Sequence, residues 1–393
     1  ARDRMKSIDL SRRSILKHSL LAMSAFMGNI LLPTSMQAAL LRLASTEELL
    51  APDENGVRLP AGFHSRIVVR SGQILFNYQW HAAPDGGAIF FTVDAGWIYV
   101  SNSELDHNAG GVGALRFDHS GKLIDAYSIL NNTNRNCAGG HTPWQTWLSC
   151  EEIAKGRVWE CDPFGKKEGQ VRAALGLFRH EAVAVDTINK QIYLTEDETD
   201  GCLYRYTARS FNTTQSHPNL DDGFLEVAEV FEGSVGKVRW HVLPDSLAQS
   251  TWTRHQVDNA THFNGGEGIW YHRGIIYFVT KGDNRVWMYD IPQQELSIIY
   301  SSSQYRSPVL TGVDNIIANQ AGELLIAEDG GDMQIVVLVA NKVFPLLQLV
   351  GHERSEIAGP ALSPDGKRLY FSSQRGSSGY NDGGITYEVT GPF

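Results

Sequence analysis

Short apolar segments come in pairs along the chain, and a turn, often Asp-Gly or Asn-Lys, separates the two members of each pair. The second member contains an apolar-aromatic pair, and a polar residue, often an acid, follows within a few positions. A third segment with alternating apolar and polar residues often comes next, as at 285–289. Alternation with a period of two is typical of β-strands, so the pattern predicts antiparallel sheets of consecutive strands. The paired segments lie at 87–91 and 97–104, 142–144 and 147–152, 180–185 and 192–197, 266–270 and 276–281, 313–317 and 324–329, and 356–360 and 369–374.

The spacing of these pairs predicts a propeller. The repeat is about 45 to 50 residues long, which suits one four-stranded blade. Six units predict an all-β fold, namely a single six-bladed β-propeller domain at 53–393, whose last blade is completed by the strand at 384–389. The third and fourth units are spaced almost twice as far apart as the others, so we expect an insertion at about 210–262. A pair of β-sandwiches is the alternative, but it predicts no fixed period of this length.

The N-terminal 39 residues differ from the repeats and indicate export. Arg12 and Arg13 form a twin-arginine pattern within 11–17, and an apolar stretch follows at 19–32. That stretch is too short, and too often interrupted by Ser, Gly and Asn, for a stable membrane span. We therefore expect residues 1–39 to be a signal region for the twin-arginine export machinery, and the protein to be periplasmic or secreted. A basic amphipathic helix is the alternative.

Composition agrees with a β-protein and narrows the choice of partner. The chain has 393 residues, of which 38 are Gly and 6 are Met, a mixture that favours short strands and tight turns. Its formal net charge of −10 makes nucleic acid an unsuitable partner. Among the four cysteines, Cys150 and Cys161 could form a disulfide after export, whereas Cys137 lies in a Gly-rich turn and is a candidate free thiolate.

Acidic residues recur at two places in the repeat. In a propeller the first strand of each blade lines the central channel, and the turn after the second strand lies near a channel mouth. Carboxylates gathered there repel one another and take up protons unless a cation neutralises them. Several blades that each give one or two oxygen ligands predict a cage for calcium or a related cation; solvated turn residues are the alternative for the acids after the second strands. The acids are Glu181, Glu267, Asp314 and Glu356 on the first strands, and Glu104, Glu151, Glu152, Glu196, Asp197, Glu328 and Asp329 after the second strands.

A thiol among these carboxylates changes the metal that we expect. Calcium binds oxygen rather than sulfur, so Cys137 beside carboxylates suggests iron or zinc next to calcium. His141 and His180 could also bind a metal, although a lone His is more often a hydrogen-bonded core or surface residue. Basic residues near the same turns could bind an anionic group, although any one of them, taken alone, is more typical of an ordinary surface charge. These are Lys281, Arg375 and Arg179.

At these motifs the sequence resembles the PhoX-type alkaline phosphatase family. The stretch 136–152, which runs from Asn-Cys-Ala-Gly-Gly-His-Thr-Pro-Trp to Cys-Glu-Glu, is its most specific part. The resemblance covers nearly all of the chain after the signal region and implies a twin-arginine-exported, six-bladed propeller that hydrolyses phosphate monoesters with an iron pair and calcium ions. The further matching stretches are 178–181, 267–268, 314–315, 356–360 and 364–366.

The resemblance also implies roles for individual residues. Cys137 would be the thiolate that binds iron, and Glu181 and Glu267 would be carboxylates shared among the metals. These three residues form the expected catalytic core. The expected metal ligands are Glu104, Cys137, Glu151, Glu152, Glu181, Glu267, Asp314, Asp329 and Glu356.

One position departs from the family pattern. Family members have an arginine that helps to hold phosphate two residues before the glutamate that matches Glu267, whereas this chain has Gly265. We therefore expect a metal-dependent phosphomonoesterase whose substrate-binding residues are Lys281, Arg375 and His180. The sequence shows no Ser-His-Asp arrangement or P-loop that would suggest another route. The alternatives are a calcium-dependent propeller lactonase or esterase, which needs no thiol, and a non-catalytic periplasmic binding propeller, which Gly265 favours.

Overall fold

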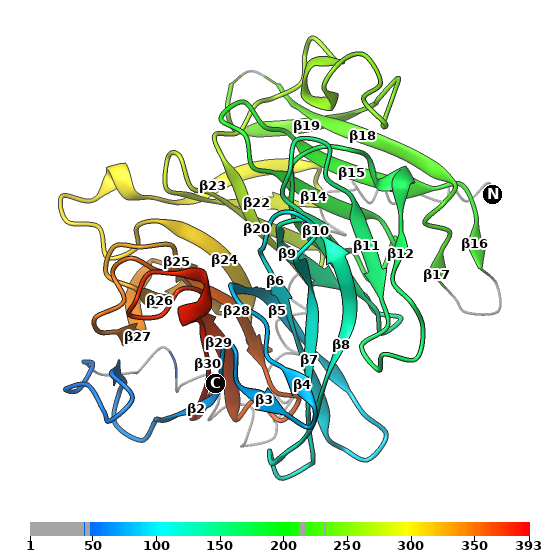
Figure 1. Cartoon of the computed structure of the whole chain (residues 1–393). Coiled ribbons are helices and arrows are strands. Elements are labelled where there is room, and N and C mark those ends of the chain that lie inside the picture. Colours follow the sequence, from blue (N-terminus) through cyan, green and yellow to red (C-terminus); the bar gives the residue numbers. More distant parts are fainter. Residues whose placement is uncertain (1–42, 44–47, 213–216, 232) are drawn as a thin grey trace, which may run out of the picture.

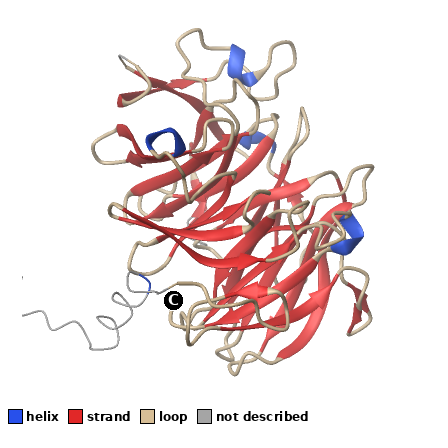
Figure 2. Cartoon of the chain, turned by 90° about the vertical axis from the view of Figure 1, so that its left-hand side faces the viewer, coloured by secondary structure: helices blue, strands red, loops and turns tan. Residues whose placement is uncertain are grey.

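The computed structural model describes residue 43 and residues 48–212, 217–231 and 233–393 (Figure 1). The predicted signal region at 1–39 lies outside the described residues. Among the described residues no helix is long and apolar enough to cross a membrane. Nearly all regular structure there is β-strand, with a few short 3₁₀ helices on connecting loops (Figure 2). These helices are η2 (Ala173–Leu175), η3 (Thr253–His255), η4 (Ser302–Gln304) and η5 (Asn381–Gly383).

The strands form antiparallel sheets in which consecutive strands pair, as predicted. The first large sheet contains β5 (Pro84–Phe91), β6 (Trp97–Ser103), β7 (Gly110–Phe117) and β8 (Leu123–Thr133). The second contains β9 (Asn136–His141), β10 (Trp147–Glu151), β11 (Val158–Cys161) and β12 (Gln170–Val171). A nine-stranded sheet contains β13 (His180–Val185), β14 (Ile192–Glu196), β15 (Leu203–Ala208), β18 (Gly223–Val230), β19 (Gly236–Val242), β23 (Glu295–Ser301), β22 (Arg285–Asp290), β21 (Ile275–Thr280) and β20 (Gly266–His272).

Two further large sheets include strands from the N-terminal part of the chain. One contains β24 (Val313–Ala318), β25 (Leu324–Glu328), β26 (Gln334–Val339), β27 (Lys342–Leu349) and β1 (Val57–Arg58). The other contains β28 (Ile357–Leu362), β29 (Arg368–Ser373), β30 (Ile385–Thr390) and β2 (His64–Arg70). Two small hairpins are β3 (Ile74–Leu75) with β4 (Tyr78–Gln79), and β16 (Phe211–Asn212) with β17 (His217–Pro218).

The arrangement of the sheets is propeller-like. The first strands β5, β9, β13, β20, β24 and β28 contact one another in this order, and β28 packs against β5, so the ring is closed. The closure is reinforced because β2 pairs with β30, which brings the two ends of the described chain together (Figure 1). A cavity of about 170 Å³ lies between the first strands.

Close packing of the first strands depends on glycine. A Cβ atom added at Gly86 of β5 would lie 2.5 Å from the Cα of Ala138 on β9, and one at Gly140 would lie 2.1 Å from the carbonyl oxygen of Val183 on β13. Neither position has room for a side chain. Glycine therefore lets neighbouring first strands approach closely enough to converge on one small site.

Buried apolar side chains hold the sheets to one another. Strand β13, with the sequence His-Glu-Ala-Val-Ala-Val, is buried along its whole length, because it faces the channel on one side and a neighbouring sheet on the other. Large rings pack between the two halves of the nine-stranded sheet, such as Tyr193 on β14 and Tyr289 on β22, which are fully buried with centroids 6.0 Å apart. Each buried ring of this size contributes about 1.5–3 kcal/mol.

The structure settles one open question on cysteine and describes the expected insertion. All four cysteines are free, so Cys150 and Cys161 form no disulfide. They lie on the paired strands β10 and β11 but face Val158 and Trp147, respectively. Within 210–262, β18 pairs with β15 as the fourth strand of its unit, and β19 extends from β18 to β23 of the next unit.

Candidate metal centre

Six first strands bring potential metal ligands to the same end of the channel. In five of them the second residue carries a carboxylate or thiol, and in the sixth the acid stands immediately before the strand. A break in register follows the start of β5, β13, β20 and β24, where the ladder skips residues of the first strand. Such bulges re-aim a side chain, and here the re-aimed residues face one another across the channel. These residues are Asp85, Cys137, Glu181, Glu267, Asp314 and Glu356.

A second tier comes from the residues that immediately follow the second strands. These residues stand at equivalent positions of the six units, so the repeat brings them to the same end of the channel as the first tier. Four of them are acids, one is an amide and one is a lysine. They are Glu104 after β6, Glu152 after β10, Asp197 after β14, Lys281 after β21, Asp329 after β25 and Gln374 after β29.

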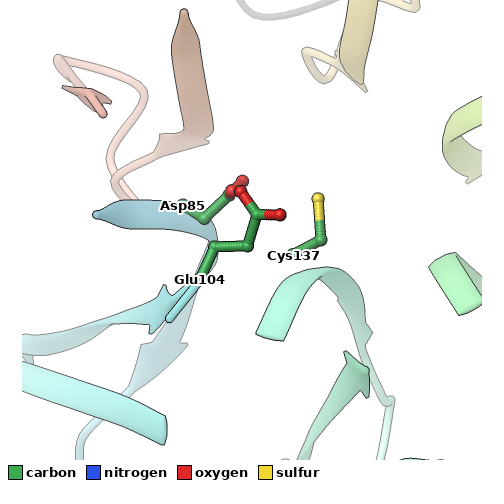
Figure 3. Close-up of side chains that lie close together, drawn as sticks. All are labelled: Asp85, Glu104 and Cys137. Carbon is green, nitrogen blue, oxygen red and sulfur yellow. The ribbon is translucent and has the colours of Figure 1, made fainter. Parts of the chain in front are cut away.

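The two tiers form a continuous belt of potential ligands. Within each of four groups of three residues, one ligand atom per residue lies within 4.8 Å of the others. Neighbouring groups share a residue, so the belt runs without a gap from Asp85 to Glu356. Figure 3 shows Asp85, Glu104 and Cys137 pointing toward a common space. The groups are Asp85–Glu104–Cys137, Cys137–Glu152–Glu181, Glu181–Glu267–Asp314 and Asp314–Asp329–Glu356.

The belt has two ends of different chemistry. We call the groups that contain the thiol the thiol end, which comprises Asp85, Glu104, Cys137, Glu152 and Glu181. We call the remainder the lysine end, which comprises Glu267, Asp314, Asp329 and Glu356 together with Lys281.

The carboxylates of the belt are buried, so they need positive charge nearby if they are to stay ionised. Glu181 and Glu267 are only 1% and 2% exposed. Burial raises the pKa of both carboxyls well above its ordinary value, and the neighbouring acids raise it further. Glu181 Oε2 is a buried oxygen that accepts no hydrogen bond from any described residue. Buried polar atoms are rarely left unsatisfied, so this oxygen fits metal coordination.

The thiol is held among carboxylates. Cys137 Sγ donates a hydrogen bond to Glu181 Oε1 at 3.1 Å, and the side chain is buried. Burial raises the pKa of the thiol well above its usual range, and the negative charges of Asp85 and Glu181 raise it further. The thiolate therefore forms here only beside a strong cation. Sulfur and oxygen donors together fit iron or zinc rather than calcium alone.

At the lysine end an ammonium group already faces the carboxylates. Lys281 Nζ lies 3.0 Å from Glu267 Oε1, 3.2 Å from Asp314 Oδ2 and 3.0 Å from Asp329 Oδ2. Burial alone would lower the pKa of Lys281, but the carboxylates of Asp314, Glu267 and Asp329 raise it above its ordinary value. Arg375 adds a second cation, since its Nη2 lies 3.0 Å from Glu356 Oε2.

At the thiol end the charged partners lie at the rim. Arg135 bridges Glu104 and Glu152, with its Nη2 2.7 Å from Glu104 Oε1 and 3.1 Å from Glu152 Oε2. Arg179 Nε lies 3.1 Å from Glu152 Oε1. The amide of Gln374 donates to Glu104 Oε2 at 2.8 Å and to Asp85 Oδ2. These contacts orient the carboxylates from outside and leave the space between them free of cationic side chains from the described chain.

The structure places most of the predicted metal ligands in the belt, but Glu151 lies apart from it. Its Oε1 accepts a hydrogen bond from the backbone N–H of Asn134, and its Oε2 accepts from the backbone N–H of Arg157 and pairs with that guanidinium at 3.0 Å. Glu151 is the last residue of β10, and successive side chains of a strand point to opposite sides. Glu152 therefore faces the belt, whereas Glu151 fixes the turn behind it.

The same alternation accounts for two more acids of the sequence pattern. Glu196 ends β14 and accepts a hydrogen bond from the backbone N–H of Cys202. Glu328 ends β25 and accepts from the backbone N–H groups of Thr311 and Gln334. Both belong to the turns rather than to the belt.

His180 also lies apart from the belt and from any position where a substrate could reach it. Its Nε2 bonds to the carbonyl oxygen of Gly176 at 2.8 Å, and its ring packs on Phe178 with centroids 3.6 Å apart. Burial lowers its pKa to about 3, so the ring stays neutral. It precedes Glu181 on β13 and therefore points into the sheet interface. The structure thus places His180, which the sequence predicted to bind substrate, in the sheet interface and not at the belt. His141 ends β9 at the opposite end of the channel, where its ring meets Trp270.

Three residues of the site were missed by sequence reasoning. Asp85 is 1% exposed and occupies the same position in β5 that Cys137 and Glu181 occupy in their strands. It stands directly before Gly86-Gly87, so alignment of the six units on their first strands would have identified it. Gln374 and Arg135 carried no comparable signal, because the amide breaks the acidic pattern and the arginine precedes its strand.

Comparison with known proteins identifies the family. The sequence profile described as alkaline phosphatase PhoX matches residues 99–168 and 154–376. No curated protein matches the sequence. Pseudomonas fluorescens PhoX, solved in complex with vanadate as a transition state analogue, has a similar structure with a TM-score of 0.72 at 16% identity, covering 88% of this chain and 97% of that one.

A second structure shares the fold more distantly. A Bacteroides thetaiotaomicron protein of unknown function has a TM-score of 0.52 at 8% identity, over 84% of this chain and 76% of that one. The profile spans more than half of the chain and includes most of the belt, from Glu104 to Glu356. The chain therefore belongs to the alkaline phosphatase PhoX family and is a phosphoester hydrolase.

Proposed function

We propose that the protein is a metal-dependent phosphomonoesterase whose catalytic centre is the belt, loaded with iron at the thiol end and with calcium elsewhere. One observation carries this proposal. All six first strands bring a carboxylate or a thiol to the same end of the channel, within a buried space that the described residues leave short of positive charge. Stability alone does not explain so many buried acids, because each costs free energy unless it takes up a proton or a cation is bound.

The donor types suggest how the metals divide. Cys137, Glu152 and Glu181 combine sulfur with oxygen and would hold iron. The all-oxygen groups that include Asp314 and Glu356 would suit calcium. Bound metal ions would supply the positive charge that stabilises the phosphoryl group as the bond from phosphorus to the leaving oxygen breaks.

Arg179 is our choice for the residue that contacts the phosphoryl group. Its Nη1 and Nη2 atoms have no partner among the described residues, and its side chain is 32% exposed at the rim of the thiol end. A guanidinium with two free nitrogens can bind a phosphoryl group through two hydrogen bonds. Arg375 is less available, because it donates to the backbone carbonyl of Arg354, to Gln374 and to Glu356. At Gly265, where the family has arginine, φ is +71°, so a side chain there would be strained.

The test measures metals and turnover on the same sample. Unchelated protein is analysed for iron and calcium by mass spectrometry and assayed with p-nitrophenyl phosphate, and so is Cys137→Ala. We expect iron, calcium and turnover in the parent protein, and loss of iron and activity in the variant. Cys161→Ala is the matched control, because that thiol is also buried but lies on β11, away from the belt.

Each other outcome points to a different function. Full iron content and rate in Cys137→Ala would refute the thiolate assignment. Calcium without iron, together with hydrolysis of lactones, would support a propeller lactonase. Metals without turnover on a broad panel of phosphate esters would support a binding protein.

The fold and location belong to the same proposal. We infer a six-bladed propeller, in which the nine-stranded sheet holds two blades, β13–β14–β15–β18 and β20–β21–β22–β23, bridged by β19. The ring of six first strands supports this count. We also propose that the twin-arginine pattern directs export to the periplasm. Replacement of Arg12 and Arg13 by lysine should then leave the protein in the cytoplasm, as measured by cell fractionation.

A further inference from the structure

The residues that immediately follow the second strands are of the same chemical kind in every unit but one. In five of the six units this residue is an acid or an amide, whereas in the unit of β20 and β21 it is Lys281. The equivalent residue of the next unit is Asp329, which lies beside it. The unit thus offers an ammonium group where its neighbours offer oxygen ligands.

The ammonium of Lys281 stands where a cation bound by the belt would stand. Nζ contacts one oxygen from each of Glu267, Asp314 and Asp329 at 3.0–3.2 Å. Glu267 and Asp314 belong to one of the groups that could hold an ion, and Asp314 and Asp329 belong to the neighbouring group. An ammonium with three carboxylate neighbours supplies half of the charge that a divalent ion would bring, together with three hydrogen-bond donors.

The main chain fixes Lys281 in this position. Its backbone N–H donates to the carbonyl oxygen of Gly265 at 2.8 Å, and its own carbonyl accepts from Asn284. Glu267 is only 2% exposed, and its Oε1 has Lys281 Nζ, at 3.0 Å, as its ion-pair partner. Without the ammonium this buried oxygen would have no cationic partner among the described residues, so a metal ion could take that place.

We propose that Lys281 is a built-in cation that takes the place of one divalent metal ion at the lysine end, so that its removal opens a cation site formed by Glu267, Asp314 and Asp329. The inference rests on the proposed metal centre but not on the phosphatase reaction. The ammonium neutralises the carboxylates without a metal, and the protein keeps this part of the belt assembled when calcium is scarce. The ligand of the opened site is a hard divalent cation, because all three donors are carboxylate oxygens.

The first experiment counts bound ions. The parent protein and Lys281→Met are equilibrated with calcium and analysed by native mass spectrometry, with iron measured on the same samples. We expect the variant to bind about one more Ca²⁺ per chain than the parent protein. Lys281→Arg keeps the charge and should bind no extra ion. Lys237→Met is the matched control, since that lysine pairs with Glu295 on the exposed surface.

A second experiment measures thermal stability, as the Tm, instead of the number of bound ions. Without calcium, Lys281→Met leaves three carboxylates without their cation, so its Tm should fall below that of the parent protein. Calcium should restore most of the loss in the variant and raise the Tm of the parent protein by less. Equal calcium content in the two proteins, with no calcium-dependent rescue, would overturn the proposal.

The parent protein gives a test that does not depend on a variant folding. Crystals soaked in Mn²⁺ should show no anomalous peak between Glu267, Asp314 and Asp329, where Nζ should remain. A peak there, with Lys281 displaced, would refute the inference. Iron separates this result from the proposed function: a sample with iron and turnover but no extra calcium site in Lys281→Met contradicts the inference alone. A sample without iron contradicts the proposed function and leaves the calcium comparison readable.

Discussion

The two ends of the belt solve the same electrostatic problem in opposite ways. Both gather buried carboxylates that repel one another. At the lysine end the chain supplies its own cations, with Lys281 between three carboxylates and Arg375 on Glu356. At the thiol end the arginines stay at the rim, and the buried space between Asp85, Cys137 and Glu181 receives no cationic side chain from the described residues.

The two ends of the belt therefore differ in whether their carboxylates need a metal ion to stay in place. A carboxylate neutralised by a lysine keeps its place without a metal, whereas a carboxylate beside a buried thiol does not. We therefore expect the thiol end to depend on metal for both structure and activity, and the lysine end to depend on it less. Each of the following predictions tests that contrast.

Among the changes considered below, the largest effect should come from Asp85→Asn. This change keeps the shape of the side chain but removes a charge from the thiol end, where Asp85 shares a group with Glu104 and Cys137. We expect kcat for p-nitrophenyl phosphate to fall by about 100-fold or more, with iron content reduced. Asp118→Asn is the control, because that acid lies in an exposed turn. An unchanged rate would remove Asp85 from the centre.

Removal of the metals should make stability depend on pH. Burial and neighbouring charges raise the pKa of Glu152 from its ordinary 4.5 to about 8 and that of Asp314 from 3.8 to about 6. The folded chain then holds protons that the unfolded chain releases, so this part of the stability is present below the ordinary pKa and is lost as pH rises through the raised one. We expect the Tm of chelated protein to fall between pH 5 and pH 8, by thermal unfolding. Metal-loaded protein should show little of this fall, and a chelated Tm that rises with pH would contradict the charge balance described here.

A smaller effect should follow Arg179→Gln. Loss of the guanidinium removes a contact with the phosphoryl group but leaves the metal ligands in place. We expect KM to rise by about tenfold with a smaller change in kcat and unchanged iron content. Arg157→Gln provides the control, since Arg157 pairs with the turn acid Glu151 and not with the belt. If the metal content falls with KM unchanged, Arg179 orients Glu152 instead.

The smallest effect on activity should come from Glu151→Gln. Its carboxylate accepts two backbone N–H bonds in a turn, so the change should destabilise the fold by about 1–3 kcal/mol. Metal content and kcat should stay at parental values in the folded variant. Denaturant unfolding and metal analysis check both parts. Loss of metal from a stably folded variant would mean that the belt extends to Glu151.

Much of this site could be predicted from the repeat pattern, because the pattern indicates on which strand and at which position of that strand a residue lies. The acids Glu181, Glu267 and Asp314 could be predicted as channel residues from their place at the start of a first strand. Glu151 and Glu152 were predicted together, although strict alternation along β10 already implied that only one of them could face the belt. The pattern could not reveal the breaks in register that turn Asp85 and its equivalents inward, since these depend on how two strands pair rather than on either sequence alone.

The contacts of the basic residues could not be predicted from sequence for a similar reason. Lys281 and Arg375 were placed at the correct turns, but a turn position does not state whether a charged group meets solvent, a substrate or a carboxylate. That choice depends on neighbours supplied by other units, such as Asp329 for Lys281.

The seam between β2 and β30 sets an order of events during synthesis. The ligands of the belt are spread from Asp85 to Glu356, and the ring that positions them closes where β28 packs against β5, a closure that the pairing of β2 with β30 reinforces. A nascent chain on the ribosome therefore lacks the closed ring until β28 has emerged, and lacks its reinforcement until β30 has emerged. We expect metal uptake to follow the emergence of these strands, so a chain truncated before β28 should reach the cell's quality control without a cofactor instead of as a partly active enzyme.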